Sequence, residues 1–248
     1  MKRTLLFCLC FSFCYVISAE SSYDVYQKIC ELLPLCKDSS SGAIDSDGNY
    51  TKNSGNGLNC AGFAKWIIDG FYTPLTLEDK PKYISLVQLR KKHLQERGTP
   101  DILIYEDSRD PYFGLDWTRN LAVELGNKRC EIAGYKSYDI TDSSVCEYVV
   151  NCGYPLSIIE KVIKEQAEKS TDKIFLGSIN GFYGKSPILW QHYHIAVFIP
   201  YYEDDNLRIA VLERNKETSF EYLLSRYPDT WCHLVGISTV GEFKLKTP

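Results

Sequence analysis

The spacing of apolar residues divides this chain into a helical first part and a strand-rich last third. Apolar positions recur three and four residues apart over residues 23–35 and from Asn59 to about Phe71, which predicts two amphipathic helices. Pro155 stands where a first helical residue is expected, so it should open another helix that runs to Lys169. Three more helices are expected at residues 76–97, 116–125 and 217–227.

After Ser170 the pattern changes to alternating or densely β-branched and aromatic positions, which is typical of strands. We expect strands at residues 173–179, 193–201, 207–214 and 233–240. The second and third are joined by a turn-forming cluster at residues 203–206, so they should form a hairpin. Helices followed by an antiparallel sheet predict an α+β fold.

The first residues resemble a secretory signal peptide. Lys2 and Arg3 precede an apolar run at residues 4–17, and Ser18 and Ala19 supply small residues before Glu20. The run is shorter than the roughly 20 residues that span a bilayer, which disfavours a membrane anchor. Cysteines in this run leave a lipoprotein anchor open, although none follows the usual lipobox pattern. We therefore expect residues 1–19 to be removed, residues 20–248 to form one domain, and the protein to be secreted or periplasmic.

Charge and composition exclude some partners. The formal net charge is -4, and loss of Lys2 and Arg3 would make it more negative. Such a chain lacks the basic face that nucleic-acid binding requires. No later stretch is long and apolar enough to suggest stable membrane insertion. The oligomeric state is not indicated by the sequence.

The cysteines suggest disulfides and one unpaired thiol. Ten cysteines occur, of which Cys8, Cys10 and Cys14 lie in the leader. Exported proteins meet an oxidising compartment, so the other seven suggest bridges. Spacing favours two pairs and elimination a third, although sequence alone cannot fix the connectivity; the pairs are Cys30 with Cys36, Cys146 with Cys152, and Cys130 with Cys232. This pairing leaves Cys60 free. No Cys-x-x-Cys pair occurs, so no metal site is expected.

Cys60 is the candidate nucleophile. It directly follows Asn59, a good N-cap, at the first turn of its predicted helix. Backbone N–H groups and the helix dipole there favour a thiolate, the reactive form of cysteine. The alternative is an inert buried cysteine or a disulfide partner.

A nucleophilic thiol also requires a nearby imidazole. The four histidines are His93, His192, His194 and His233. His93 lies in a Lys/Arg-rich stretch typical of a solvated surface. His192 and His194 begin a predicted strand and, being two residues apart, should share a face. His233 opens the last strand, and too few residues follow it for a partner strand that would carry an orienting residue.

Two of these segments resemble the NlpC-type cell-wall peptidases, compact members of the papain-like superfamily. The stretch Gly57–Trp66 resembles the family's Asp-Cys-Ser-Gly-Phe motif, and Tyr193–Ile199 resembles its His-Val-Gly-Ile-Tyr strand. Between them, Asp172–Leu176 resembles its Gly-Asp-Leu-Val-Phe strand. The resemblance implies a papain-like core, with the Cys60 helix packed on an antiparallel sheet. It also implies that Cys60 is the nucleophile and His194 the base.

The family's third catalytic residue is polar and lies on the strand after the histidine strand. Glu213 and Asn215 share one face at this height, and Glu213 is slightly preferred, since a carboxylate would fix the imidazole tautomer. Two departures stand out. Asn59 and Ala61 replace the family's Asp and Ser, and Cys60 and His194 are about twice as far apart as in the family. Residues 73–170 are therefore interpreted as a mostly helical insertion.

Within that insertion, Asp116 and Trp117 lie in a stretch crowded with aromatic and charged residues at a loop-to-helix junction. They are candidate substrate-binding residues, in a loop over the cleft. The equally open alternative is an aromatic anchor that pins the insertion to the core.

The resemblance implies a cysteine peptidase or amidase without a cofactor, acting on an amide of peptidoglycan stem peptides through a thioester. Two alternatives remain. One is a thiol acyltransferase on the same fold, and the other is an exported binding module without turnover.

Overall fold

The structure is a computed structural model that describes residues 20–38, 57–75, 89, 111–170, 172–184 and 188–248. The expected leader at residues 1–19 lies outside the described residues. So does the helix expected at residues 76–97, apart from Leu89, and His93 with it. Among the described residues, no helix combines the length and the apolar character needed to cross a bilayer.

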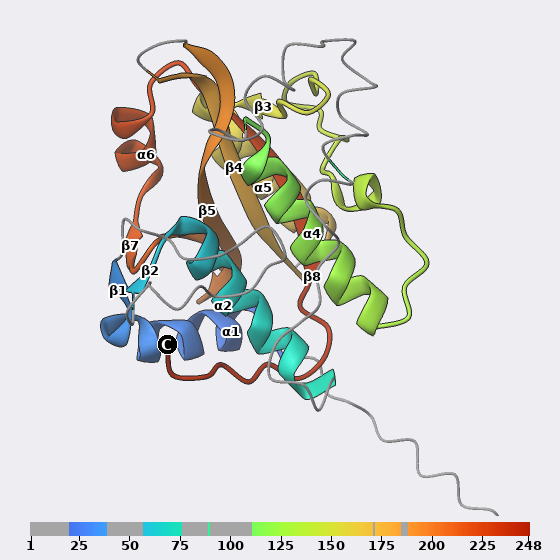
Figure 1. Cartoon of the computed structure of the whole chain (residues 1–248). Helices are drawn as coiled ribbons and strands as arrows, with labels where there is room; N and C mark the ends of the chain where they lie inside the picture. The colour runs from blue at the N-terminus through green and yellow to red at the C-terminus, as the bar shows by residue number, and fades with distance from the viewer. Residues whose placement is uncertain (1–19, 39–56, 76–88, 90–110, 171, 185–187) are drawn as a thin grey trace, which may run out of the picture.

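A six-stranded antiparallel sheet forms the centre of the molecule (Figure 1). β5 and β6 form the predicted hairpin, with Glu203 opposite Asn206. The strands lie in the order β3 (Tyr154–Pro155), β8 (Trp231–Ser238), β4 (Lys173–Tyr183), β5 (Leu189–Glu203), β6 (Asn206–Glu213) and β7 (Lys216–Thr218). With the helices that precede and cover it, this sheet confirms the α+β fold class.

The last strand lies inside the sheet. β8 pairs with β4 on one side and with β3 on the other, so both of its neighbours come earlier in the chain. The expectation that His233 would lack a partner strand is therefore wrong, because it considered only the residues that follow His233.

The described helices follow the predicted order, with one correction. They are α1 (Ser22–Leu32), α2 (Cys60–Tyr72), α4 (Phe113–Lys128), α5 (Ile159–Lys169) and α6 (Phe220–Arg226). Pro155 does not open α5. It lies in β3 opposite Trp231, and a short 3-10 turn (Leu156–Ile158) separates it from the helix. A φ of -53° and a ψ of 135° place Pro155 in the extended conformation.

Helices cover both faces of the sheet. On one face, buried residues of α1, α2 and α4 pack against Leu176, Val197 and Leu212. On the other face, α5 and Leu223 of α6 pack against Phe175, Phe198 and Val211. The alternation of these strand residues between faces follows from the period of a β-strand. Both clusters include residues from 111–170, so this part of the expected insertion belongs to the same hydrophobic core.

The cysteines differ from the expectation. All seven described cysteines are free thiols, so none of the three expected bridges is present in the structure. Cys232 is fully buried in the core on the α5 face, whereas Cys130 is exposed at the end of α4. These two cysteines were paired only because they remained after the two pairs with matched spacing, which carries no information on their proximity in the fold.

The C-terminal residues run past the end of α2, the helix that carries Cys60, and on to α1 (Figure 1). Phe243 is 1% exposed and its ring lies 4.6 Å from that of Phe71. A Cβ on Gly70 would come within 2.3 Å of the Phe243 ring, so glycine is needed there for close approach. Backbone groups add to this packing, since Lys244 N donates to Gly70 O at 2.8 Å.

We predict that Phe243→Ala destabilises the protein by about 3–5 kcal/mol, because it removes a buried aromatic ring and leaves a cavity against α2. Urea unfolding followed by circular dichroism measures the change. Val240→Ala, at a position 53% exposed, is the control and should change the free energy of unfolding by less than about 0.5 kcal/mol. Equal effects of the two substitutions would contradict the packing described for Phe243.

Candidate active site

Cys60 begins helix α2, as the sequence predicted. Asn59 is the N-cap, and its side-chain oxygen accepts a hydrogen bond from Gly62 N at 2.7 Å. The short strand β2 (Gly57–Leu58) leads into this cap and pairs with β1 (Lys37–Asp38). Cys60 is half-buried at the point where its helix meets the sheet. The cap thus fixes the direction of the helix, and the helix fixes the position of the sulfur.

The sheet brings a histidine and a carboxylate to this sulfur. His194 lies on β5 and Glu213 at the end of β6, and His194 Nε2 is 2.7 Å from Glu213 Oε2. Both residues are 3% exposed. Asn215, the other candidate for this role, instead donates to Cys36 O at 3.4 Å. Geometry therefore places Glu213, and not Asn215, against the imidazole of His194.

The thiol and the imidazole favour each other's charged forms. Burial acts to raise the pKa of the Cys60 thiol, but hydrogen bonding and the charge of His194 outweigh it, and the pKa lies below its ordinary value. The Ile195 N–H and the charge of Arg214 lower it further. For His194, burial acts to lower the pKa, yet hydrogen bonds to Cys60 and Glu213 raise it to about 9. At neutral pH these shifts favour a thiolate beside an imidazolium.

An irregularity in the sheet separates the two neighbouring histidines. The register of β4 and β5 shifts between Ile179, opposite His194, and Asn180, opposite His192. In a regular strand the two histidines would share a face and similar partners. Here His192 Nδ1 lies 2.9 Å from Ser178 Oγ in the buried core, whereas His194 contacts Cys60 and Glu213. Such bulges re-aim a side chain, often next to active sites.

The structure adds two residues that the sequence did not indicate. The ring of Tyr227, at the end of α6, stacks on His194 with centroids 4.9 Å apart. Arg214 follows Glu213 directly and has a φ of 56°, in the left-handed region that non-glycine residues seldom adopt. Neither position carries a motif. Only the fold brings α6 against β5 and places the charge of Arg214 where it acts on Cys60.

Asp116 and Trp117 lie away from the solvent. They are 0% and 1% exposed in the first turns of α4. Trp117 Nε1 donates to Ala61 O at 2.9 Å, and the ring stacks on Phe113. This is the arrangement of an anchor that holds α4 against the start of α2, the alternative to a substrate-binding loop over a cleft.

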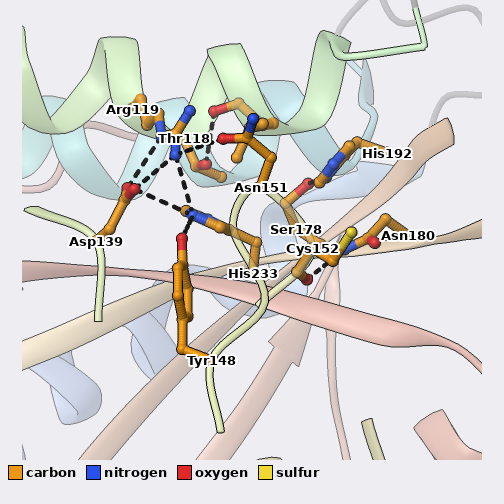
Figure 2. A network of polar contacts seen from close by, with 11 residues as sticks. Thr118, Arg119, Asp139, Tyr148, Asn151, Cys152, Ser178, Asn180, His192 and His233 are labelled. Carbon is orange, nitrogen blue, oxygen red and sulfur yellow. Dashed lines mark hydrogen bonds and ion pairs between the residues drawn. The ribbon is translucent and has the colours of Figure 1, made fainter. Parts of the chain in front are cut away.

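A second polar network lies in the core around His233 (Figure 2). Arg119 of α4 is paired with Asp139 by two contacts, Nε to Oδ1 at 2.9 Å and Nη2 to Oδ2 at 2.5 Å. His233 Nε2 lies 3.3 Å from Asp139 Oδ2 and 3.1 Å from the Tyr148 hydroxyl. Arg119 also donates to Asn151 at 3.1 Å. The network ties α4 to β8 and to the turn before β3.

The network around His233 is enclosed in the core. Arg119 and His233 are fully buried, so neither reaches solvent where a substrate would bind. Burial acts to raise the pKa of Asp139, but the charges and hydrogen bonds of His233 and Arg119 overcome it and lower the pKa to about 2. His233 is therefore engaged as a buried partner of Asp139, and His194 is the imidazole at the Cys60 thiol.

We predict that Asp139→Asn destabilises the protein by about 3–5 kcal/mol, because the buried Arg119 guanidinium loses its counter-charge. The folded pKa of Asp139, about 2, is below its value of about 3.9 in an unfolded chain. Its stabilisation is therefore complete above about pH 4 and disappears as the pH falls through about 2. Urea unfolding between pH 2 and pH 7 measures this dependence.

Asp205→Asn, in the exposed β5–β6 turn, is the matched control for that experiment. It should keep the wild-type dependence between pH 2 and pH 4, whereas Asp139→Asn should flatten it. Identical pH profiles in the two variants would show that Asp139 does not couple folding to protonation.

No protein-family model, curated protein or solved structure matches this chain.

Proposed function

We propose that this chain is an exported cysteine hydrolase that cleaves an amide bond. In this proposal Cys60 is the nucleophile, His194 transfers the proton and Glu213 orients the imidazole. The observation that carries the proposal is the Cys60–His194–Glu213 arrangement, with 2.7 Å between His194 Nε2 and Glu213 Oε2 and with pKa shifts that favour a thiolate and an imidazolium. A nucleophile, a base and an orienting group in series form the constellation that acyl transfer requires.

The reaction proceeds through a thioester. The Cys60 thiolate attacks the amide carbonyl carbon, and backbone N–H groups at the start of α2 stabilise the oxyanion that forms. The His194 imidazolium donates its proton to the amide nitrogen, so the C–N bond breaks and the amine leaves. Water then attacks the thioester carbon while His194 accepts its proton. The acid is released and the Cys60 thiolate is restored.

The proposed family is the NlpC-type, papain-like peptidases, and the proposed substrate is an amide in peptidoglycan stem peptides. Support comes from the motifs around Cys60 and His194, from the packing of α2 on the antiparallel sheet and from the position of Glu213 on the strand after His194. The leader-like residues 1–19 support export to the compartment that holds such a substrate. Acyl transfer to an amine would use the same thioester and differ only in the acceptor.

We predict that Cys60→Ala abolishes the release of new amino termini from soluble peptidoglycan fragments, because no thioester can form. Glu213→Gln should lower kcat by about 10²–10⁴-fold, since the imidazole loses the carboxylate that orients it and stabilises its protonated form. Mass spectrometry of the products, with and without an added amine, measures turnover and separates hydrolysis from transfer.

Asn215→Ala is the matched control, because Asn215 lies two residues from Glu213 but bonds to Cys36. It should retain wild-type kcat. A Cys60→Ala protein that still cleaves, or equal losses in Glu213→Gln and Asn215→Ala, would overturn the assigned roles.

A further inference from the structure

A cavity of about 310 Å³ opens beside the imidazole of His194. Its walls come from the end of β4, the start of β5, the turn after β6 and the end of α6, and they include Tyr183, Tyr193, His194, Arg214, Arg226 and Tyr227. This volume is at the lower end of the range for small-ligand pockets. It can therefore hold a group about the size of one amino-acid residue next to His194.

Two guanidinium groups give this cavity its charge, and no carboxylate is among its described lining residues. Arg226 is exposed at its mouth, and Arg214 is partly exposed. Asp38 contacts Arg214 from outside this cavity at 3.0 and 3.2 Å, and both contacts use Nη1. Nε and Nη2 of Arg214 are not used by Asp38. A guanidinium presents five N–H donors in a planar fork that suits a carboxylate.

Arg214 is held close to the nucleophile. It follows Glu213, which contacts His194, and its charge acts on the Cys60 sulfur. Its left-handed backbone at φ 56° costs free energy for a residue with a Cβ. Strained backbone of this kind concentrates at ligand-binding and catalytic positions. The turn therefore places a guanidinium in the wall of the same cavity that His194 lines.

Aromatic rings complete the walls. Tyr183 and Tyr193 stack with centroids 4.5 Å apart, and Tyr227 lies between His194, at 4.9 Å, and Arg226, whose guanidinium carbon is 5.8 Å from the ring centroid. The guanidinium of Arg226 above a ring suits a planar, negatively charged group such as a carboxylate.

We propose that this cavity is the substrate subsite for a negatively charged group, namely a carboxylate of the peptide being cleaved, held by Arg214 and Arg226 beside His194, the partner of the Cys60 thiol. This inference rests on the proposed function, because it assumes that Cys60 is the reacting atom. It adds that the enzyme prefers acyl donors that carry a carboxylate close to the scissile amide.

The test compares two alkylating probes of similar size, anionic iodoacetate and neutral iodoacetamide, by peptide mapping of Cys60 in the full chain. The ratio of their rates cancels the thiolate fraction, so a changed Cys60 pKa does not affect it. Exposed Cys130 in the same molecules gives the reference ratio. We expect iodoacetate to be favoured at Cys60 relative to Cys130. Arg214→Gln should lower this preference about fivefold, the effect of one unit charge at about 4 Å in water.

Three further variants sharpen the result. Arg226→Gln should lower the preference less than Arg214→Gln, and Arg214→Lys should retain most of it. Arg208→Gln removes the same charge from the exposed far end of β6 and should leave the ratio unchanged. Equal ratios in the wild type and in all Arg variants would overturn the subsite, as would an Arg208→Gln effect as large as that of Arg214→Gln.

The outcomes separate this inference from the proposed function. If Cys60 reacts with neither probe at neutral pH, the thiolate and the proposed hydrolase both fail. If Cys60 reacts rapidly with iodoacetamide but shows no Arg-dependent preference for iodoacetate, only the subsite fails. Protection of Cys60 by glutarate should exceed protection by inorganic phosphate at equal ionic strength, and the reverse order would refute the carboxylate assignment.

Discussion

The contact between His194 and Glu213 is the constraint on which the site depends. Two largely buried groups, 2.7 Å apart on neighbouring strands, hold the imidazole in one orientation, and this orientation turns its other edge toward Cys60. Burial alone would neutralise the thiol and the imidazole. Their mutual attraction, with the carboxylate behind it, reverses both shifts. The reactivity proposed for Cys60 therefore comes from the sheet as much as from the helix that carries the sulfur.

The remainder of the fold holds α2 in a fixed position against that sheet. Trp117 holds α4 to the carbonyl of Ala61, the residue after the nucleophile, and Phe243 packs the C-terminal segment against the other end of the helix. The Arg119–Asp139 pair then fixes α4 to β8. Residues 111–170, the described part of the segment 73–170 that was interpreted from the sequence as an insertion, thus support the site from within the core. A small displacement of a nucleophile lowers the reaction rate strongly. A rigid, buried support therefore suits the helix that carries Cys60.

Much of the site could be predicted because its signals are local. The sequence shows a cysteine after an N-cap, a histidine in a β-branched strand and an acidic residue at the end of the next strand. The structure brings these residues, Cys60, His194 and Glu213, together. Long-range features could not be recognised in the sequence. The position of β8 between β3 and β4, the stacking of Tyr227 and the aim of Arg214 depend on which elements meet in space. The structure contains none of the expected disulfides among the described residues, and spacing along the chain does not report distance across the fold.

The protonation state of His194 tests the central claim, a charged Cys60–His194 pair held by Glu213, most directly. In the full chain labelled with ¹⁵N-histidine, NMR titration follows the imidazole nitrogens of all four histidines, and the signals lost in a His194→Gln variant identify this ring. We expect His194 to be doubly protonated at pH 7 and to titrate near pH 9, and we expect Cys60→Ala to move its pKa down, because a raising partner is lost. A His194 that is neutral at pH 7 and unchanged by Cys60→Ala would contradict the account.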